Sequence, residues 1–541
     1  MLHKIYHWFD RTILELGREF QWTYLPPLMV YLAAGISGLT GIVGTFFVKD
    51  HLGLSAEFLA ALGFWAGIPW ALKMPLGHLV DLIWRYKFIL VYIGAGLIGT
   101  SLLIMIGLLA HTDFMAGIMS VNAWFVISAL LAPIGYVVQD VVADAMTVEA
   151  VPNIDDQGRP TDPAKKRLMH TTMQTLGRVA IIGGSVFVAM LNVYMFDGAD
   201  GMAEAEKVAT YVGIYEMALL IPIISVSGVL FGGYLKLKKY RTLRKNGISH
   251  VDAWGVIHTQ AEAPSPNWWI LGGSLVFVIF TVSLGLSDFE FNQEVIFIGS
   301  FAIVSFLMWR LMQVLDENSR RILLGTAIII FVFRALPGPG PGSSWWMIDA
   351  LKFDQQFFSV LSLISSSLTL LGMFLFRRFM AEKSIAYIVV FLTIASTILS
   401  LPIIGMFYDL HVWTAAISGG VVDARFIALV DTAIESPLGQ IAMIPMLAWI
   451  ANSAPAQLKA TFFAVMASFT NLALSLSQLG TKYLNQTYTI TREVKDRATG
   501  EITTPADYSE LGALLITVTI IGISLPLLAI WVVKQTRLKS A

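Results

Sequence analysis

Long apolar segments dominate the chain and alternate with short polar stretches. Segments of roughly 20 apolar residues are long enough to cross a bilayer as helices. Six such spans are predicted in the first part of the chain, at 25–48, 57–80, 86–110, 118–150, 167–196 and 208–233. Eight more follow, at 268–286, 293–312, 321–336, 355–376, 384–408, 426–452, 458–485 and 509–533. The pattern predicts an all-α polytopic membrane protein with 14 transmembrane helices.

Two stretches without such spans divide the chain. Residues 1–22 place apolar and charged side chains on opposite helical faces, which predicts an interfacial amphipathic segment or, equally, a soluble extension of the first span. Residues 234–266 contain LKLKKYRTLRKNG and two prolines, which indicates a cytoplasmic connector. The division predicted from these stretches is an N-terminal six-helix bundle at 23–233, an inserted helix pair at 267–312 and a C-terminal six-helix bundle at 313–541. The alternative for the pair is that it belongs to a different fourteen-helix architecture.

Two long loops are predicted on the external side. Gln486–Pro505 alternates like a small hairpin around Ala498–Gly500. Pro337–Ser344 has the composition of an extended turn, and we expect Trp345 and Trp346 behind it to lie at the membrane interface.

The distribution of basic residues gives an orientation. Of the 36 Lys and Arg residues, eight fall in the segments that this topology places outside and two fall inside spans, which leaves 26 for the cytoplasmic side. Because cytoplasmic loops carry an excess of Lys and Arg, both termini are expected to be cytoplasmic. The expected location is a bacterial inner membrane or plasma membrane.

Composition supports a membrane protein and excludes several other classes. Apolar residues make up 56% of the chain, charged residues 13%, and the mean hydropathy is +0.70. A net charge of −1 gives no electrostatic basis for nucleic acid binding, and the absence of Cys excludes disulfides, thiol catalysis and thiolate metal sites.

Two carboxylates lie inside the fourth predicted span. Asp140 and Asp144 are one helical turn apart on one face, and charges at such depth usually face a bundle interior or a wet cavity. Arg178 in the next span lies at a matching depth, about 16 to 18 Å from the cytoplasmic end by helical rise. An Asp140–Arg178 pair is therefore predicted. Two roles for Asp140 are equally open: a functional one in proton coupling or solute binding, and a structural one in a permanent ion pair between two helices. Asp144 is shallower, which leaves a gating role open for it.

A second polar centre is predicted in the C-terminal half. Asp431 and Glu435 are again four residues apart and are followed by Gln440, while Arg334 lies at a depth close to that of Glu435. Asn471 belongs to a polar stripe on span 458–485, which serves either a solute pathway or contacts between helices.

Several motifs resemble the folate-biopterin transporter family of the major facilitator superfamily. Between Gly38 and Lys87 the shared residues are Lys49-Asp50, Leu52-Gly53-Leu54 and the pattern Pro69-Trp70, Lys73, Pro75, Gly77 and Asp81. QDVVADAMTVE is similar to the family's fourth-helix signature, with its acidic positions at Asp140, Asp144 and Glu149. Asp431, Glu435, Gln440, Pro445, Pro455 and ATFFAVMASFTN are similar to the late helices. The inserted pair and the long loop at Ile154–Lys165 depart from the ordinary pattern.

The resemblance implies a major facilitator fold with a midplane site between two six-helix bundles. It implies a secondary transporter, working as a symporter, in which protons drive folate, pterin or a similar anionic aromatic solute by alternating access. Asp140, Asp144, Arg178, Arg334, Asp431, Glu435, Gln440 and Asn471 are the predicted solute-binding or proton-coupling residues. Lys73, Gly77, Asp81, Arg85 and Glu149 are the predicted cytoplasmic gate. The expected partners are the solute, protons and the lipid bilayer, and we expect a monomer with no cofactor, metal or nucleic acid.

Other functions are left open by the sequence. The insertion and the residue order around Gln139–Pro152 are also similar to the muropeptide permease group, so a cell-wall fragment or another organic anion is the alternative solute. An intramembrane enzyme is disfavoured because no paired His or His/Glu ligand spacing occurs inside a span. A receptor without transport is the remaining class.

Overall fold

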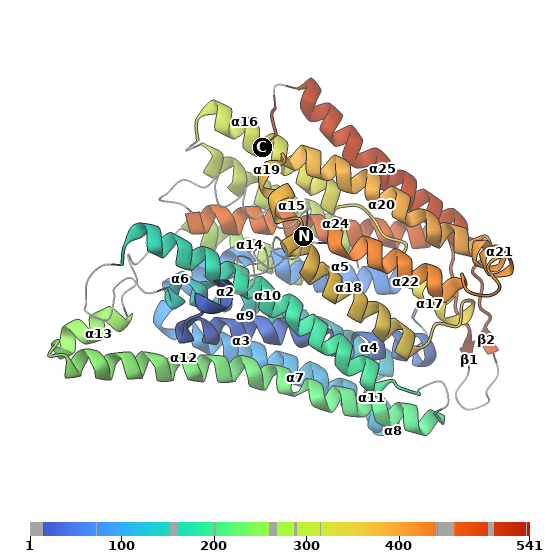
Figure 1. The fold of residues 1–541 in the computed structure, drawn as a ribbon, viewed down its shortest axis with the longest axis horizontal. Coiled ribbons are helices and arrows are strands. Elements are labelled where there is room, and N and C mark those ends of the chain that lie inside the picture. The colour runs from blue at the N-terminus through green and yellow to red at the C-terminus, as the bar shows by residue number, and fades with distance from the viewer. Residues whose placement is uncertain are drawn as a thin grey trace, which may run out of the picture.

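The computed structural model is a bundle of long helices (Figure 1). It describes residues 15–541 apart from 53, 72, 152–160, 199–201, 259–267, 286–288, 314, 440, 442–458, 496–501, 537 and 541. Most of residues 1–22 therefore lie outside the described part, which holds of that segment the short helix α2 (Glu15–Arg18) and the start of a 3-10 turn.

The N-terminal half contains the helices of the first six predicted spans. They are η2 (Trp22–Tyr24), α3 (Leu25–Ile36), η3 (Ser37–Thr40), α4 (Gly41–His51), α5 (Ala56–Ala71), α6 (Lys73–Leu82), η4 (Trp84–Tyr86), α7 (Phe88–Ala110), α8 (Thr112–Ile118), α9 (Val121–Ala150), α10 (Pro163–Met195), α11 (Glu204–Ala218) and α12 (Leu220–Lys245). Helix α12 continues into the predicted connector, and α13 (His250–His258) packs back against it.

The C-terminal half follows the two helices of the predicted inserted pair, α14 (Trp268–Gly285) and α15 (Asn292–Met312). Its elements are α16 (Glu317–Arg334), α17 (Gly342–Asp349), α18 (Gln355–Leu375), α19 (Arg377–Glu382), α20 (Ile385–Phe407), α21 (Leu410–Ile417), α22 (Ala424–Glu435), η6 (Ser436–Leu438), α24 (Lys459–Thr487), β1 (Val494–Lys495), β2 (Ile502–Thr504) and α25 (Leu511–Gln535). The strands, α17 and α21 gather at one end of the bundle, here called the hairpin end, while α13 lies at the opposite end, the connector end (Figure 1).

Ten of the described helical stretches are long and apolar enough to cross a membrane. Helices are also present at the four other predicted spans, as α14, α16, α22 and α24. These four are too short or too polar to meet the same criterion within the described residues. The all-helical membrane architecture is therefore confirmed, whereas the count of fourteen spans stays a prediction.

Within the described residues, two of the predicted spans leave regular α-helix near their middle. The first passes through the 3-10 turn η3 at Ser37–Thr40. The span with Asp431 leaves the α-helix immediately after Glu435, where Pro437 follows in η6. Such breaks place polar groups and free backbone atoms at mid-depth, as discontinuous helices do in many transporters.

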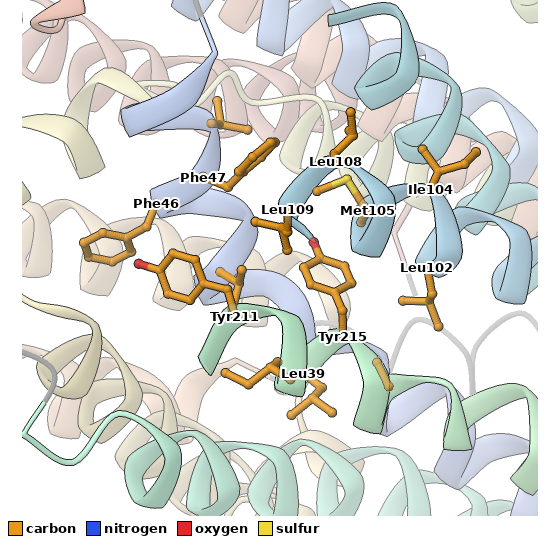
Figure 2. Packing of buried hydrophobic residues seen from close by; sticks show 14 of the residues in the cluster. Leu39, Phe46, Phe47, Leu102, Ile104, Met105, Leu108, Leu109, Tyr211 and Tyr215 are labelled. Atoms are coloured by element: carbon orange, nitrogen blue, oxygen red, sulfur yellow. The ribbon is translucent and has the colours of Figure 1, made fainter. Parts of the chain in front are cut away.

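The core of the N-terminal half lies toward the hairpin end. Buried side chains from η3, α4, α7 and α11 interdigitate there, among them Leu39, Phe46, Phe47, Leu108 and Tyr215 (Figure 2). Phe46 also packs edge to face on Phe358 of α18, with 6.0 Å between ring centroids. The apolar core thus continues across the contact between the halves.

The external loops match their predictions in part. Strands β1 and β2 pair antiparallel, which confirms the hairpin, while its predicted tip at Ala498–Gly500 lies outside the described residues. The expectation for Trp345 and Trp346 was wrong. They belong to helix α17 and are only 2% and 5% exposed, because the helix folds inward over the end of the C-terminal half.

The inserted pair lies over the seam between the halves. Phe277 of α14 and Ile296 of α15 are buried with Phe64 and Ile68 of α5. On the other side of the seam, Lys482 of α24 forms an ion pair of 3.1 Å with Glu294 of α15. The pair therefore contacts both halves.

Candidate functional site

A lysine joins the two aspartates of the fourth span. Lys73 Nζ donates to Asp140 Oδ2 at 2.6 Å and lies 2.8 Å from Asp144 Oδ2. The Lys73 and Asp140 side chains are 18% and 16% exposed, while Asp144 is 42% exposed. Asp140 is ten residues before the end of α9, about 15 Å along the helix axis. Helix α6 packs against both α9 and α24, so this polar cluster lies where the N-terminal half meets the C-terminal half.

Tyr31 completes the cluster from helix α3. Its hydroxyl donates to Asp144 Oδ1 at 2.6 Å. Close approach of the helices makes this contact possible, because a Cβ at Gly177 of α10 would lie 2.9 Å from the Tyr31 ring. A Cβ at Gly35 would likewise lie 2.2 Å from the Ile181 carbonyl oxygen. Small residues at these crossings let α3, α9 and α10 hold the cluster together.

Arg178 does not form the predicted ion pair. In the part of the chain that the structure describes, no ion pair within 4 Å joins Arg178 to Asp140, whose place as partner is taken by Lys73. Arg178 is partly buried beside Gly177, and it interacts electrostatically with Asp140 and Tyr31 from a greater distance. The depth estimate placed Arg178 in the correct region but gave it the wrong partner. Depth along a helix does not determine the rotation of the helix about its axis, and so does not determine which neighbour a side chain faces.

The predicted gate residues divide into two groups. Lys73 lies in the central cluster, whereas Glu149 accepts from Lys87 at 2.5 Å and from Lys236 at 3.1 Å near the connector end. Lys87 is buried and lies 3.5 Å from the centroid of the Trp84 ring. The remaining predicted gate residues are Gly77 and Asp81, which lie on α6, and Arg85, which is exposed in η4.

The C-terminal carboxylates have a different environment. Asp431 is 7% exposed, and its Oδ1 atom has no hydrogen-bond partner among the described residues. Glu435 lies one turn further along α22 and is exposed. No Lys or Arg within the described ranges forms an ion pair with either carboxylate. Gln440, predicted as part of this centre, lies outside the described residues, as do Pro445 and Pro455.

Arg334 and Asn471 make contacts between helices. Arg334 Nε donates to the Thr470 carbonyl of α24 at 3.1 Å, and no ion pair within the described residues joins it to Asp431 or Glu435. The predicted grouping of Arg334 with these carboxylates stays a prediction. Asn471 Nδ2 donates to the Trp70 carbonyl at 3.2 Å and so ties α24 to α5 of the other half.

Two central residues were missed by the sequence reasoning. Tyr31 is embedded in an apolar stretch, and Lys73 was placed in the cytoplasmic gate by the family resemblance. A depth estimate for every ionisable side chain in a span places Lys73 about 14 Å from Leu82, close to the depth of Asp140. The sequence therefore contains a signal for Lys73, namely its depth in the span, whereas no such signal in the sequence distinguishes Tyr31.

Comparisons with known proteins agree with this architecture. Residues 266–540 match the BT1 family. A protein of Synechocystis sp. (strain ATCC 27184 / PCC 6803 / Kazusa) named "Folate-biopterin transporter" is 23% identical over 472 residues, which cover 87% of this chain and 76% of the relative.

Solved structures show the same fold at low identity. An auto-inhibited POT family peptide transporter has a TM-score of 0.58 at 13% identity, with 96% of this chain and 98% of that chain covered. A POT family transporter in complex with 5-aminolevulinic acid has a TM-score of 0.57 at 12% identity, with 96% of each chain covered. A nucleoside transporter has a TM-score of 0.50 at 12% identity, with 94% of this chain and 99% of that chain covered.

These likenesses establish the major facilitator fold, and the family match covers half of the chain. The relatives are transporters rather than enzymes. With its apolar helices and a polar cluster between two halves, this multi-pass membrane transporter belongs to the BT1 family.

Proposed function

We propose that this transporter moves folate, a pterin or a similar anionic aromatic solute by alternating access, together with protons. The observation that carries the proposal is Lys73 bound between Asp140 and Asp144 where the halves meet. Ionisable groups at membrane depth are costly, and those that occur mark solute and proton pathways. The name of the Synechocystis relative supports the solute class.

Arg178 is the proposed contact for the anionic part of the solute. It is partly buried beside the Tyr31–Asp144 hydrogen bond, and no ion pair engages it among the described residues. A guanidinium binds a carboxylate with two parallel hydrogen bonds, which suits the tail of a folate. Glu435, exposed at the break of its span, is the proposed acceptor for the N–H donors of a pterin ring.

Asp431 is the proposed proton carrier. A buried carboxylate without a basic partner is far more costly as an anion than as a neutral acid. Within the part of the chain that the structure describes, Asp431 has that environment, whereas Asp140 and Asp144 share the positive charge of Lys73. This arrangement would divide the work, with the N-terminal half binding the anion and the C-terminal half exchanging the proton.

We also propose that the hairpin end faces outward and both termini face the cytoplasm. The excess of Lys and Arg on the opposite side supports this orientation. Polar contacts between the halves lie at the hairpin end, where Gln486 donates to Glu57 at 2.6 Å and Gln356 donates to Asp197 at 2.9 Å. In this orientation, the conformation is closed to the outside.

Uptake of labelled folate into proteoliposomes tests the proposal. An acidic exterior should stimulate uptake in the native protein, and Asp431→Asn should abolish the stimulation. Arg178→Ala should raise the KM for folate roughly tenfold, the effect of losing about 1.4 kcal/mol of binding. It should leave a neutral pterin almost unaffected. Arg310→Ala is the matched control, because Arg310 lies over Trp269 in the inserted pair, away from the cluster. Folate transport that depends neither on the pH gradient nor on the Asp431 carboxyl would contradict the coupling.

A muropeptide-like cell-wall fragment or another organic anion is the second candidate solute. The inserted pair α14 and α15 is the observation that favours it, because the ordinary twelve-helix pattern lacks such a pair. Competition of unlabelled muropeptides, folate and pterins against one labelled solute separates the candidates. Stronger competition by the muropeptide than by folate would reassign the substrate class.

A further inference from the structure

The segment between α24 and α25 reaches from the C-terminal half to the N-terminal half. Thr491 and Asp507 exchange backbone hydrogen bonds of 3.0 and 2.9 Å at its base, next to the hairpin of β1 and β2 at the right of Figure 1. Arg492 follows Thr491 directly, and only 3% of it is exposed. An arginine this deeply buried in a loop must have compensating contacts.

The contacts of Arg492 cross between the halves. Its Nη1 atom donates to the carbonyl of Val48 and, at 2.8 Å, to that of Lys49, both in the last turn of α4. The carbonyls in the last turn of a helix carry partial negative charge, which favours a cation, and the Val48 carbonyl also accepts from Leu52 N at 3.3 Å. The guanidinium also lies 5.1 Å from the centroid of the Trp345 ring of α17. Arg492 thus caps a helix of the opposite half while it rests on an aromatic ring of its own half.

A second set of charges continues this contact. Lys49 of α4 forms an ion pair of 2.6 Å with Asp349 of α17, and Tyr508 donates to the other oxygen of Asp349 at 2.5 Å. Burial and the hydrogen bond to Asp349 raise the pKa of the Tyr508 phenol well above its ordinary value, which keeps the phenol protonated as the donor. Asp349 therefore accepts from both halves at once.

We infer that Arg492 is a latch of the transport cycle, which holds the halves together at the hairpin end and leaves the end of α4 when the solute path opens there. The inference rests on the alternating access of the proposed function. It adds a positioning residue that belongs to neither polar centre and has no direct contact with the solute.

The chemistry of the contact suits a reversible latch. The acceptors are backbone carbonyls, so the geometry follows from helix α4 itself rather than from one side chain. When the halves part, the guanidinium and the carbonyls regain water, which offsets much of the loss and keeps opening accessible. A purely apolar plug would gain no such hydration on opening.

Labelling of a single cysteine measures the latch directly. The chain contains no Cys, so Phe46→Cys introduces one thiol, at a position that is 4% exposed and packed on Phe358 across the halves. In nanodiscs, which expose both membrane faces, Arg492→Ala should raise the rate of labelling by a polar maleimide roughly tenfold, as expected for the loss of a charge-assisted contact. Arg492→Lys keeps the charge and should give an intermediate rate.

Arg425→Ala is the matched control. Arg425 donates to the Lys352 carbonyl and to Asp354, and it lies over Phe357, so all these contacts stay within the C-terminal half. Its removal should leave the labelling rate unchanged. A cooperative thermal transition would show that Arg492→Ala is folded. If the folded variant is labelled at the same rate as Arg425→Ala, the inference is overturned.

A second variant covers the case in which Arg492→Ala does not fold. Asp349→Asn weakens the ion pair with Lys49 without touching Arg492, and it should also raise the labelling rate of Phe46→Cys. An unchanged rate in this folded variant would likewise overturn the latch. Since no solute is added, failure here is distinct from failure of the folate or proton assignment.

Discussion

The two acidic pairs of this transporter share a sequence pattern and differ in electrostatics. Asp140 and Asp144 in α9 are four residues apart, as are Asp431 and Glu435 in α22. Lys73 bridges the first pair, whereas the described residues supply no basic partner for the second. Carboxylate spacing therefore identifies a polar centre but does not determine whether a basic residue balances its charge.

The cause lies in the neighbouring helices. Helix α9 packs against α6, which begins with Lys73. Helix α22 packs against α18 and α20, and neither helix contains a Lys or Arg within its bounds. One half therefore holds a largely compensated charge cluster, and the other holds a buried carboxylate to which the described residues supply no basic partner.

The largest expected effect comes from removing the bridging lysine. Lys73→Met leaves two carboxylates close together without their counter-charge, so we expect a loss of about 3 kcal/mol in unfolding free energy and at least hundredfold slower transport. Thermal unfolding in detergent and uptake into proteoliposomes measure the two effects.

Lys482→Ala is the control for Lys73→Met. Its ion pair with Glu294 is similarly buried, with side chains 13% and 18% exposed, but it lies between α15 and α24. It should lower the thermal midpoint while transport continues. Equal transport losses in the two variants would remove the distinction between the central cluster and a structural ion pair.

For Asp431→Asn we expect a smaller change in stability than for Lys73→Met, together with a selective loss of gradient-driven uptake. If the carboxyl carries the proton, a neutral isostere should change the unfolding free energy by less than about 1 kcal/mol. Uptake driven by a pH gradient should fall at least tenfold, while solute exchange without a gradient continues.

Asp423→Asn provides the comparison on the same helix. Asp423 caps the start of α22 by accepting from Phe426 N at 2.8 Å, and Asn preserves such a cap. Its gradient-driven uptake should remain normal. If Asp431→Asn also retains gradient-driven uptake, the division of roles between the halves is refuted.

The smallest effect is expected at the seam between the halves. Asn471→Ala removes the hydrogen bond to the Trp70 carbonyl, and contacts of this kind contribute about 0.6 kcal/mol on average inside membranes. We expect a shift of one or two degrees in the thermal midpoint and near-normal KM for folate. A tenfold rise in KM would instead make Asn471 a solute contact and extend the site onto α24.

Local sequence was sufficient for the helices and for the acidic residues inside them. Apolar length predicted the spans, and Asp431 with Glu435 was recognised as polar within one of them. An error arose where a partner had to be chosen. Arg178 was paired with Asp140 by depth alone, whereas Lys73 is the ion-pair partner of Asp140 in the structure.

What the sequence determined by itself is the membrane class, the helical architecture, the hairpin and the presence of an acidic pair in each half. These properties depend on apolar length, strand alternation and the cost of burying charge, all of which are local. Only the tertiary structure decided that Lys73 and Tyr31 join Asp140 and Asp144, and that Arg492 caps α4 across the halves. Such contacts depend on helix rotation, close crossings at glycine and loop placement, and residues 444 positions apart carry no common local pattern.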